Sequence, residues 1–254
     1  MNDDALIRIE KLSKRFRNIF VLRDLDLNIY RGETIVIMGQ SGEGKSVLLR
    51  HIIGLVKPDS GRILIDGRDI VPLSDREMNS IRKRFGVLFQ GAALFDSMTV
   101  GENVAFGLSQ HTRMSDEEKY VKVRDLLHVV GLEGIEDFKP AELSGGMRKR
   151  VGLARAIAMD PEIIFYDEPT TGIDPVMADT INNLILKLKM KLQVTSIVVT
   201  HDMTSAFKIA DRIAMLYDGK IIELAKTDDF RHSASSIVQQ FIHGSAVGPL
   251  TREQ

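Results

Sequence analysis

The chain has 254 residues, of which 44% are hydrophobic and 27% charged, and its formal net charge is −1. This composition suits a globular protein with a sizeable core and argues against disorder and against a chain-wide nucleic-acid surface. The sequence holds no cysteine, which excludes disulfides and thiolate chemistry. The N-terminus has no secretory pattern, and no stretch reaches the ~20 apolar residues of a membrane-spanning helix. Two basic runs, 82–84 and 148–150, are expected on solvated helix faces.

The order of apolar patterns along the chain predicts an α/β protein with a helical insert at about 91–160. Strands are expected at 6–9, 21–29, 34–38, 61–67, 85–89, 163–166 and 196–200, with a hairpin of 213–217 and 220–223. Helices are expected at 47–54, 75–84, 100–108, 116–130, 145–159, 175–192, 203–210 and 236–242. The end of the chain, 244–254, is expected to be extended.

A glycine-rich loop between the strand at 34–38 and the helix at 47–54 is predicted to bind phosphate. The loop consists of Gly39, Gln40, Ser41, Gly42, Glu43, Gly44, Lys45 and Ser46. Glycines let backbone N–H groups turn toward phosphate oxygens, and the helix N-terminus adds a favourable dipole. Lys45 is expected to contact the β- and γ-phosphates of ATP, and Ser46 to offer its hydroxyl to Mg²⁺. The strand–loop–helix context makes this pattern specific.

Two acidic residues end the apolar strand expected at 163–166. Asp167 is expected to reach the Mg²⁺ shell, and Glu168 to polarise a water for attack on the γ-phosphate. Alone, the pair would be an ordinary strand end capped by Pro169. Its position on a separate strand after the phosphate loop favours the catalytic interpretation.

A second anion site is predicted where Ser144, Gly145 and Gly146 open the helix at 145–159. Ser144 is a good N-cap, and the two glycines expose N–H groups at the positive end of the helix. For these three residues alone, a plainly capped helix is the alternative.

The segment 143–147, Leu-Ser-Gly-Gly-Met, resembles the signature sequence of ATP-binding-cassette (ABC) ATPases. Gln90 is similar to that family's Q-loop glutamine, and the segment 171–174 to its D-loop, which ends at Asp174. His201 is similar to the switch histidine, and Phe16 stands where the family has an adenine-stacking aromatic. Two residues, Met147 and Phe16, depart from the family's commonest glutamine and tyrosine. Taken singly, His201 would fit a structural histidine, Gln90 a surface amide and Phe16 a core aromatic.

The resemblance implies an α/β P-loop NTPase fold of the ABC type. This fold has a RecA-like parallel-sheet core, an N-terminal antiparallel β subdomain and a helical insert. The implied ATP-binding domain covers 5–228, with the helical subdomain at about 91–160 and a C-terminal helix and tail at 229–254.

The resemblance also implies a head-to-tail homodimer. The phosphate loop of one copy and Ser144, Gly145 and Gly146 of the other would clasp one ATP, and Asp174 would run along the seam. The implied catalytic residues are Glu168, His201 and Gln90. The implied Mg²⁺ ligands are Ser46, Gln90 and Asp167.

Within the family, 81–95, 98–104, 142–150 and 240–249 resemble ATP-binding subunits of Mla-type phospholipid transport systems. This implies ATP-driven lipid movement between bacterial membranes and a cytoplasmic position, peripheral on the inner membrane. The implied partners are membrane permease subunits docking on the apolar groove at 91–95, a lipid-binding subunit and a small accessory subunit.

Two alternatives stay open. One is the ATPase of an amino-acid or other small-solute importer. The other is a soluble cassette protein acting on nucleic acid, which the single cassette and near-neutral charge disfavour. The apolar residues Ile237, Phe241 and Ile242 suggest that the tail helps the dimer.

Overall fold

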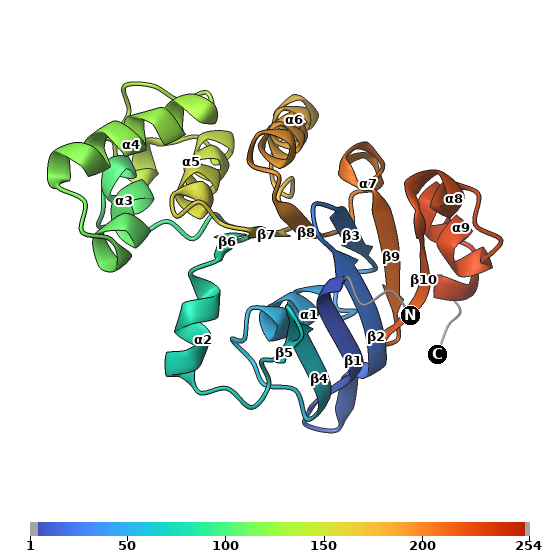
Figure 1. Ribbon diagram of the computed structural model, residues 1–254. Helices are drawn as coiled ribbons and strands as arrows, with labels where there is room; N and C mark the ends of the chain where they lie inside the picture. The colour runs from blue at the N-terminus through green and yellow to red at the C-terminus, as the bar shows by residue number, and fades with distance from the viewer. Residues whose placement is uncertain (1–4, 252–254) are drawn as a thin grey trace. The chain divides into compact units, whose positions relative to one another are not determined.

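The computed structural model describes residues 5–251, and it divides at two points of the chain (Figure 1). The first unit contains the residues up to Ser74 and those from Val198 onward. The second unit contains Asp75–Ile197. The predicted boundaries 5–228, 91–160 and 229–254 stay predictions.

An antiparallel sheet forms the N-terminal part of the first unit, in the order β2-β1-β4-β5. Its strands are β1 (Ala5–Phe16), β2 (Ile19–Tyr30), β4 (Ser60–Ile65) and β5 (Arg68–Asp69). One face is buried because apolar residues such as Ile7, Ile9, Leu25 and Leu27 alternate with polar ones. The antiparallel subdomain that the family resemblance implies is confirmed.

A second group of strands completes the first unit. β3 (Thr34–Met38) pairs in parallel with β9 (Arg212–Tyr217), and β9 pairs antiparallel with β10 (Lys220–Lys226). Every residue of β3 is buried, as the continuous apolar run predicts for a parallel strand covered on both faces. Along the chain, α1 (Lys45–Ile52) follows β3, and α7 (Met203–Ile209) precedes β9.

The C-terminal segment confirms the helix expected at 236–242 and differs from the extended end expected at 244–254. It forms α8 (Thr227–Arg231), α9 (Ser236–His243) and the 3₁₀ turn η2 (Pro249–Thr251). The Gln240 side chain, 7% exposed, accepts a hydrogen bond from Leu250 N at 2.7 Å and donates to Ser245 O at 3.0 Å. The segment therefore folds back on α9, because a buried amide needs hydrogen-bond partners. Residues 252–254 of the predicted tail lie outside the described residues.

The second unit consists of helices and the parallel strands β6 (Phe85–Leu88) and β7 (Ile163–Asp167). Its helices are α2 (Asp75–Arg82), α3 (Val100–His111), α4 (Asp116–Val129), η1 (Pro140–Glu142), α5 (Gly145–Ile157) and α6 (Pro175–Leu192). β8 (Thr195–Thr200) follows β7 in the sheet order and continues past the boundary at Val198. The expected cluster of helices α3, α4 and α5 is confirmed (Figure 1).

Side-chain caps fix where the helices of the second unit begin. Thr99 and Ser115 form capping boxes with Glu102 and Glu118 at the starts of α3 and α4. Residues that resemble nucleotide-contacting positions cap two other helices, as described below. Within residues 5–251, no helix is both long and apolar enough to cross a membrane.

Candidate functional site

The predicted phosphate loop follows β3 directly and opens α1, as its sequence context requires. Gly44 occupies the N-cap of α1 with φ +98°, in the left-handed region. A Cβ at Gly44 would lie 2.7 Å from Val21 Cγ1 and 3.0 Å from Val21 O, so only glycine fits against β2. The first turn of α1 is therefore held close to the N-terminal sheet.

Lys45 is buried inside the curve of this loop, with 6% of its surface exposed. Its Nζ donates hydrogen bonds to Gly39 O at 2.8 Å and to Gln40 O at 2.9 Å. The ammonium is thus placed among the loop's own backbone groups, which is where a lysine must lie to meet phosphate oxygens. The half-buried Ser46 follows it in the first turn.

Glu43 ties the loop to the turn between β9 and β10. Its Oε2 accepts a hydrogen bond from Asp218 N at 2.7 Å. Ser41 and Gly42, between the two anchored ends, are exposed. The loop therefore has fixed ends and an accessible middle.

Phe16 ends β1 and is 46% exposed, so the alternative that it is a core aromatic is wrong. Lys14 Nζ lies 5.5 Å from its ring centroid. A ring so exposed beside a cation is available for stacking on a flat ligand. The stacking role stays a prediction.

His201 is exposed directly after β8, and Asp202 begins the next helix. The Asp202 carboxylate accepts a hydrogen bond from Thr204 N at 3.0 Å and so caps α7. This cap fixes the backbone beside His201. The proposed contact of His201 with a phosphate is not tested by the structure.

The acidic pair of the second unit lies where β7 ends. Asp167 and Glu168 are each 8% exposed, although carboxylates are rarely buried to this degree. Glu168 has φ +49°, and its Oε2 accepts a hydrogen bond from Thr171 Oγ1 at 3.0 Å. Non-glycine residues seldom adopt a left-handed conformation, and such residues gather at functional sites.

The donor chemistry of the predicted metal ligands fits Mg²⁺. Ser46 offers a hydroxyl and Asp167 a carboxylate, and Mg²⁺ prefers such hard oxygen ligands, completed by substrate phosphates and water. Within residues 5–251, no three His, Asp or Glu side chains cluster as a ready-made metal site.

Ser144 is exposed and caps α5, with its Oγ accepting a hydrogen bond from Met147 N at 3.2 Å. A Cβ at Gly146 would lie 2.5 Å from Met177 Cγ in the first turn of α6. Asp174, exposed, caps α6 by accepting from Met177 N at 3.0 Å. The structure thus brings the signature-like segment and the D-loop-like segment together.

Gln90 is exposed two residues beyond β6, which also fits the alternative of a surface amide. Its backbone carbonyl accepts a hydrogen bond from Lys149 Nζ at 2.9 Å. The following loop bends at Ala92 (φ +62°) and Ala93 (φ +46°), and both carbonyls accept from Arg155 of α5. Gln90 and its loop are therefore bound to α5.

The expectation that 148–150 forms a solvated helix face is wrong for Lys149, whereas Arg148 is exposed and Arg150 is half-buried. Lys149 is 5% exposed, Arg148 donates to Leu143 O at 2.9 Å, and Arg150 donates to Gly131 O at 2.8 Å. Each cation thus satisfies a backbone carbonyl. Burial lowers the pKa of Arg150 below its ordinary value.

The run 82–84 is also only partly solvated. Arg84 forms two hydrogen bonds with Glu162, at 2.9 and 2.7 Å, and Arg82 contacts Asp75 at 3.4 Å. Lys83 is exposed. The Arg84–Glu162 pair joins the start of β6 to the start of β7.

Sequence reasoning missed Lys149 as a candidate. A signal was present, because positions 146, 149, 153 and 156 share one face of α5 at helical spacing and all are buried. A charged residue on an otherwise apolar stripe indicates a buried ion with a partner.

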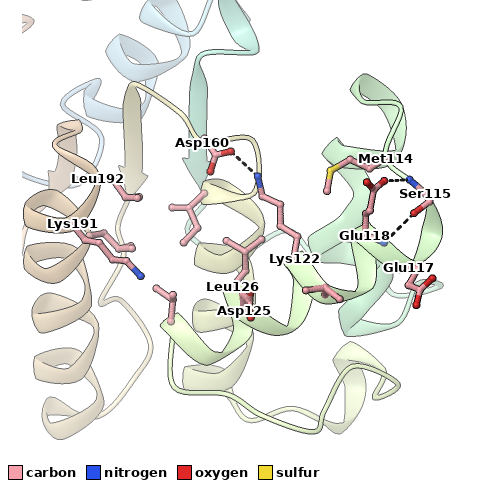
Figure 2. Close-up of a pocket in the computed structure, with 14 residues that line it drawn as sticks. Met114, Ser115, Glu117, Glu118, Lys122, Asp125, Leu126, Asp160, Lys191 and Leu192 are labelled. Carbon is pink, nitrogen blue, oxygen red and sulfur yellow. Dashed lines mark hydrogen bonds and ion pairs between the residues drawn. The ribbon is translucent and has the colours of Figure 1, made fainter.

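Two cavities of the second unit contain none of the nucleotide-binding candidates. One, of about 860 Å³, lies between α4 and α6 and is lined by apolar residues such as Leu126 and Leu188, with Lys122 paired to Asp160 at 2.6 Å (Figure 2). The other, of about 440 Å³, lies along α3 and α4 and includes Phe106.

Comparisons with known proteins agree with these features. Residues 22–171 match the family described as ABC transporter. The chain belongs to the ABC transporter family. It is an ATPase subunit, and it binds ATP. Its fold is that of an ABC-type P-loop NTPase, as the sequence predicts.

Individual relatives cover nearly all of this cassette. It is 41% identical to the "Intermembrane phospholipid transport system ATP-binding protein MlaF" of Haemophilus influenzae over 96% of the chain and 93% of that protein. It is also 41% identical to the "Probable ribonucleotide transport ATP-binding protein mkl" of Mycobacterium leprae, over 96% of the chain and 70% of that protein.

A solved structure gives the same picture. A dimeric ATP-binding cassette in a post-hydrolysis state, bound to ADP and Pi, is 36% identical, with a TM-score of 0.82 over 87% of this chain and 98% of that one. The prediction of a cassette ATPase with Mla-type resemblance is confirmed.

Proposed function

We propose that this ATPase powers the movement of phospholipid or another lipid between bacterial membranes. The supporting observation is the 41% identity to the phospholipid transport protein of Haemophilus influenzae, which extends over 93% of that relative. A match of that extent reaches well beyond the nucleotide motifs.

The proposed chemistry assigns each motif one task. Lys45, lying among the loop carbonyls, neutralises the β- and γ-phosphates. Glu168 polarises the attacking water, and Thr171 orients its carboxylate through the 3.0 Å hydrogen bond. Ser46, Gln90 and Asp167 hold Mg²⁺, which would neutralise charge on the phosphate oxygens. These groups position and stabilise, which is most of what phosphoryl transfer needs.

The working unit is proposed to be a head-to-tail homodimer. The exposed Ser144 and the adjacent glycines offer backbone N–H groups at the positive end of α5. This second anion site is far from the phosphate loop in the sequence. The similar solved cassette is dimeric. In this arrangement Asp174, also exposed, lies at the seam, and His201 contacts the γ-phosphate.

A membrane permease subunit is the proposed partner. Phe95 is 43% exposed, and its ring centroid lies 4.8 Å from that of Phe106, which lines the 440 Å³ cavity. An exposed aromatic side chain that packs on a half-buried one beside a cavity suits an amphipathic helix of a partner. The protein is then peripheral on the cytoplasmic face of the inner membrane, with lipid-binding and small accessory subunits in the complex.

The second candidate is ribonucleotide or other small-solute transport, because the mycobacterial relative of equal identity carries that description. The deciding experiment purifies the complex from membranes and identifies its subunits and bound lipid by mass spectrometry. It then measures ATP-dependent transfer of labelled phospholipid between vesicles. Lipid transfer supports the proposal. Absence of lipid, with ATP-dependent uptake of labelled ribonucleotide, would replace it by the second candidate.

A further inference from the structure

Lys149 is a buried cation that the proposed chemistry does not use. It lies in the second turn of α5, three residues after Gly146, and is 5% exposed. Lysine is almost never buried without partners, since removing an ammonium from water is costly. The groups that accept hydrogen bonds from Lys149 therefore indicate its role.

Its two hydrogen bonds reach the ends of two different strands. Nζ donates to Gln90 O at 2.9 Å and to Glu168 O at 3.3 Å. In the register of β6 and β7, Leu88 lies opposite Tyr166. Gln90 and Glu168 each follow by two residues, so they occupy equivalent positions where the ladder stops.

The ammonium therefore links the two segments of chain just beyond the last paired residues of β6 and β7. Two carbonyls that diverge from the sheet are held by one cation, and that cation is carried by the helix that Ser144 caps. Burial lowers the pKa of Lys149, and the nearby Glu168 carboxylate opposes this shift. The charge of Glu168 thus helps to keep the lysine protonated.

We propose that Lys149 is a positioning residue that fixes Gln90 and Glu168 relative to the signature-like turn of α5. This rests on the proposed roles of Gln90 and Glu168 in hydrolysis. Lys149 acts through their backbones and touches no nucleotide. Ser144, Gly145 and Gly146 open the helix whose Lys149 holds Gln90 and Glu168. When these three residues engage the nucleotide of the partner copy, α5 communicates binding at one site to hydrolysis at the other.

The test uses the full chain with Lys149→Met, which keeps the length of the side chain and removes charge and donors. Lys149→Arg keeps both. Lys187→Met is the matched control, since Lys187 is exposed on α6 of the same unit. ATP affinity is measured by calorimetry, kcat and KM by phosphate release, and folding by thermal unfolding.

Lys149→Met is expected to lower kcat about 10-fold to 100-fold, the usual effect of a small misplacement, while ATP affinity changes by less than about twofold. Lys149→Arg is expected to recover about a third or more of the wild-type kcat, and Lys187→Met to retain it. If Lys149→Met does not fold, Lys149→Gln carries the same expectation, because its amide is neutral, shorter, and has two N–H donors in place of three.

A wild-type kcat in Lys149→Met would overturn the inference. So would a loss of kcat matched by an equal loss of affinity and not rescued by arginine, which indicates a packing role alone. Failure of the proposed function looks different. If Glu168→Gln keeps its hydrolysis, the role of Glu168 is wrong whatever Lys149 does. If Glu168→Gln is inactive and Lys149→Met normal, only this inference fails.

Discussion

At the scale of single residues, the two acids after β7 are distinguished by their backbone conformation. Glu168 adopts φ +49°, and Thr171 and Lys149 hold its carboxylate and its carbonyl. Asp167, still within the strand, has the extended backbone of β7. Adjacent carboxylates thus point in different directions, which lets one serve a metal and the other a water.

Glu168→Gln is expected to lower the ATPase kcat by about 100-fold or more, because an amide does not accept the proton of the attacking water. ATP affinity, measured by calorimetry, is expected to remain close to that of the wild type. The glutamine keeps the size of the side chain and an oxygen for Thr171.

Lys45→Ala is the complementary variant, and it is expected to weaken ATP binding itself. The two variants should therefore divide binding from turnover. Substantial hydrolysis by Glu168→Gln would contradict the assignment of the water-polarising role.

At the scale of elements, α1 carries a buried histidine one turn past the phosphate loop. His51 is 1% exposed, its Nδ1 donates to Val47 O at 2.6 Å, and its Nε2 is buried without a hydrogen-bond partner. Burial lowers the pKa of His51 from its ordinary value of 6.5, against the opposing effect of the Val47 hydrogen bond. Protonation would place a charge and a second N–H in a buried position that water does not solvate.

The lowered pKa predicts that acid destabilises the fold. Below pH 6.5 the unfolded chain takes up a proton that the folded chain resists, so stability is full above that pH and falls as pH drops toward the folded pKa. This group adds at most about 1.4 kcal/mol per pH unit to the slope. We expect His51→Gln to flatten the loss of unfolding free energy between about pH 7.5 and 5.5, as measured by urea titration.

His111→Gln, which replaces an exposed histidine of α3, serves as the control and should keep the wild-type slope. A His51→Gln slope equal to that of the wild type would show that other groups cause the acid sensitivity.

The sequence predicted the elements well where the pattern was local. The strand–loop–helix order around the phosphate loop, the capped helices and the buried strand β3 depend on neighbouring residues and are confirmed, although α1 begins at Lys45, two residues earlier than expected. Lys149 was missed because its partners, Gln90 and Glu168, are far apart in sequence and meet only through the register of β6 and β7. The hydrogen bonds of the Gln240 side chain with Ser245 O and Leu250 N were missed for a similar reason, because a single amide side chain produces no sequence pattern.

At the scale of the whole molecule, the residues of the nucleotide motifs are divided between two units. Phe16, the phosphate loop and His201 belong to the first unit, and Gln90, the signature-like segment and Asp174 belong to the second. Motif spacing predicts the members of such a site. Motif spacing does not give their arrangement in space, because residues far apart in the sequence leave no pattern that encodes it.

The C-terminal segment is predicted to support the dimer. α9 carries the half-buried Ile237, Phe241 and Ile242, and Val247 beyond it is 86% exposed. Such an apolar surface suits a second copy. Deleting 236–254 in the Glu168→Gln background is expected to weaken ATP-dependent dimerisation about tenfold or more, measured by analytical ultracentrifugation.

A shorter deletion, of 244–254, keeps α9 and serves as the matched comparison. Thermal unfolding without ATP controls for damage to the monomer. A dimer of unchanged affinity after the longer deletion would remove this role.

The binding of the loop after Gln90 to α5 has a consequence for engineering. Lys149 and Arg155 hold the carbonyls of Gln90, Ala92 and Ala93 along the length of one helix. This part of the loop is not available for exchange without refitting α5. In a chimera designed for a different partner, the exchanged segment should begin at Leu94. A graft that begins earlier removes the hydrogen bonds to α5 and is expected to lose ATPase activity.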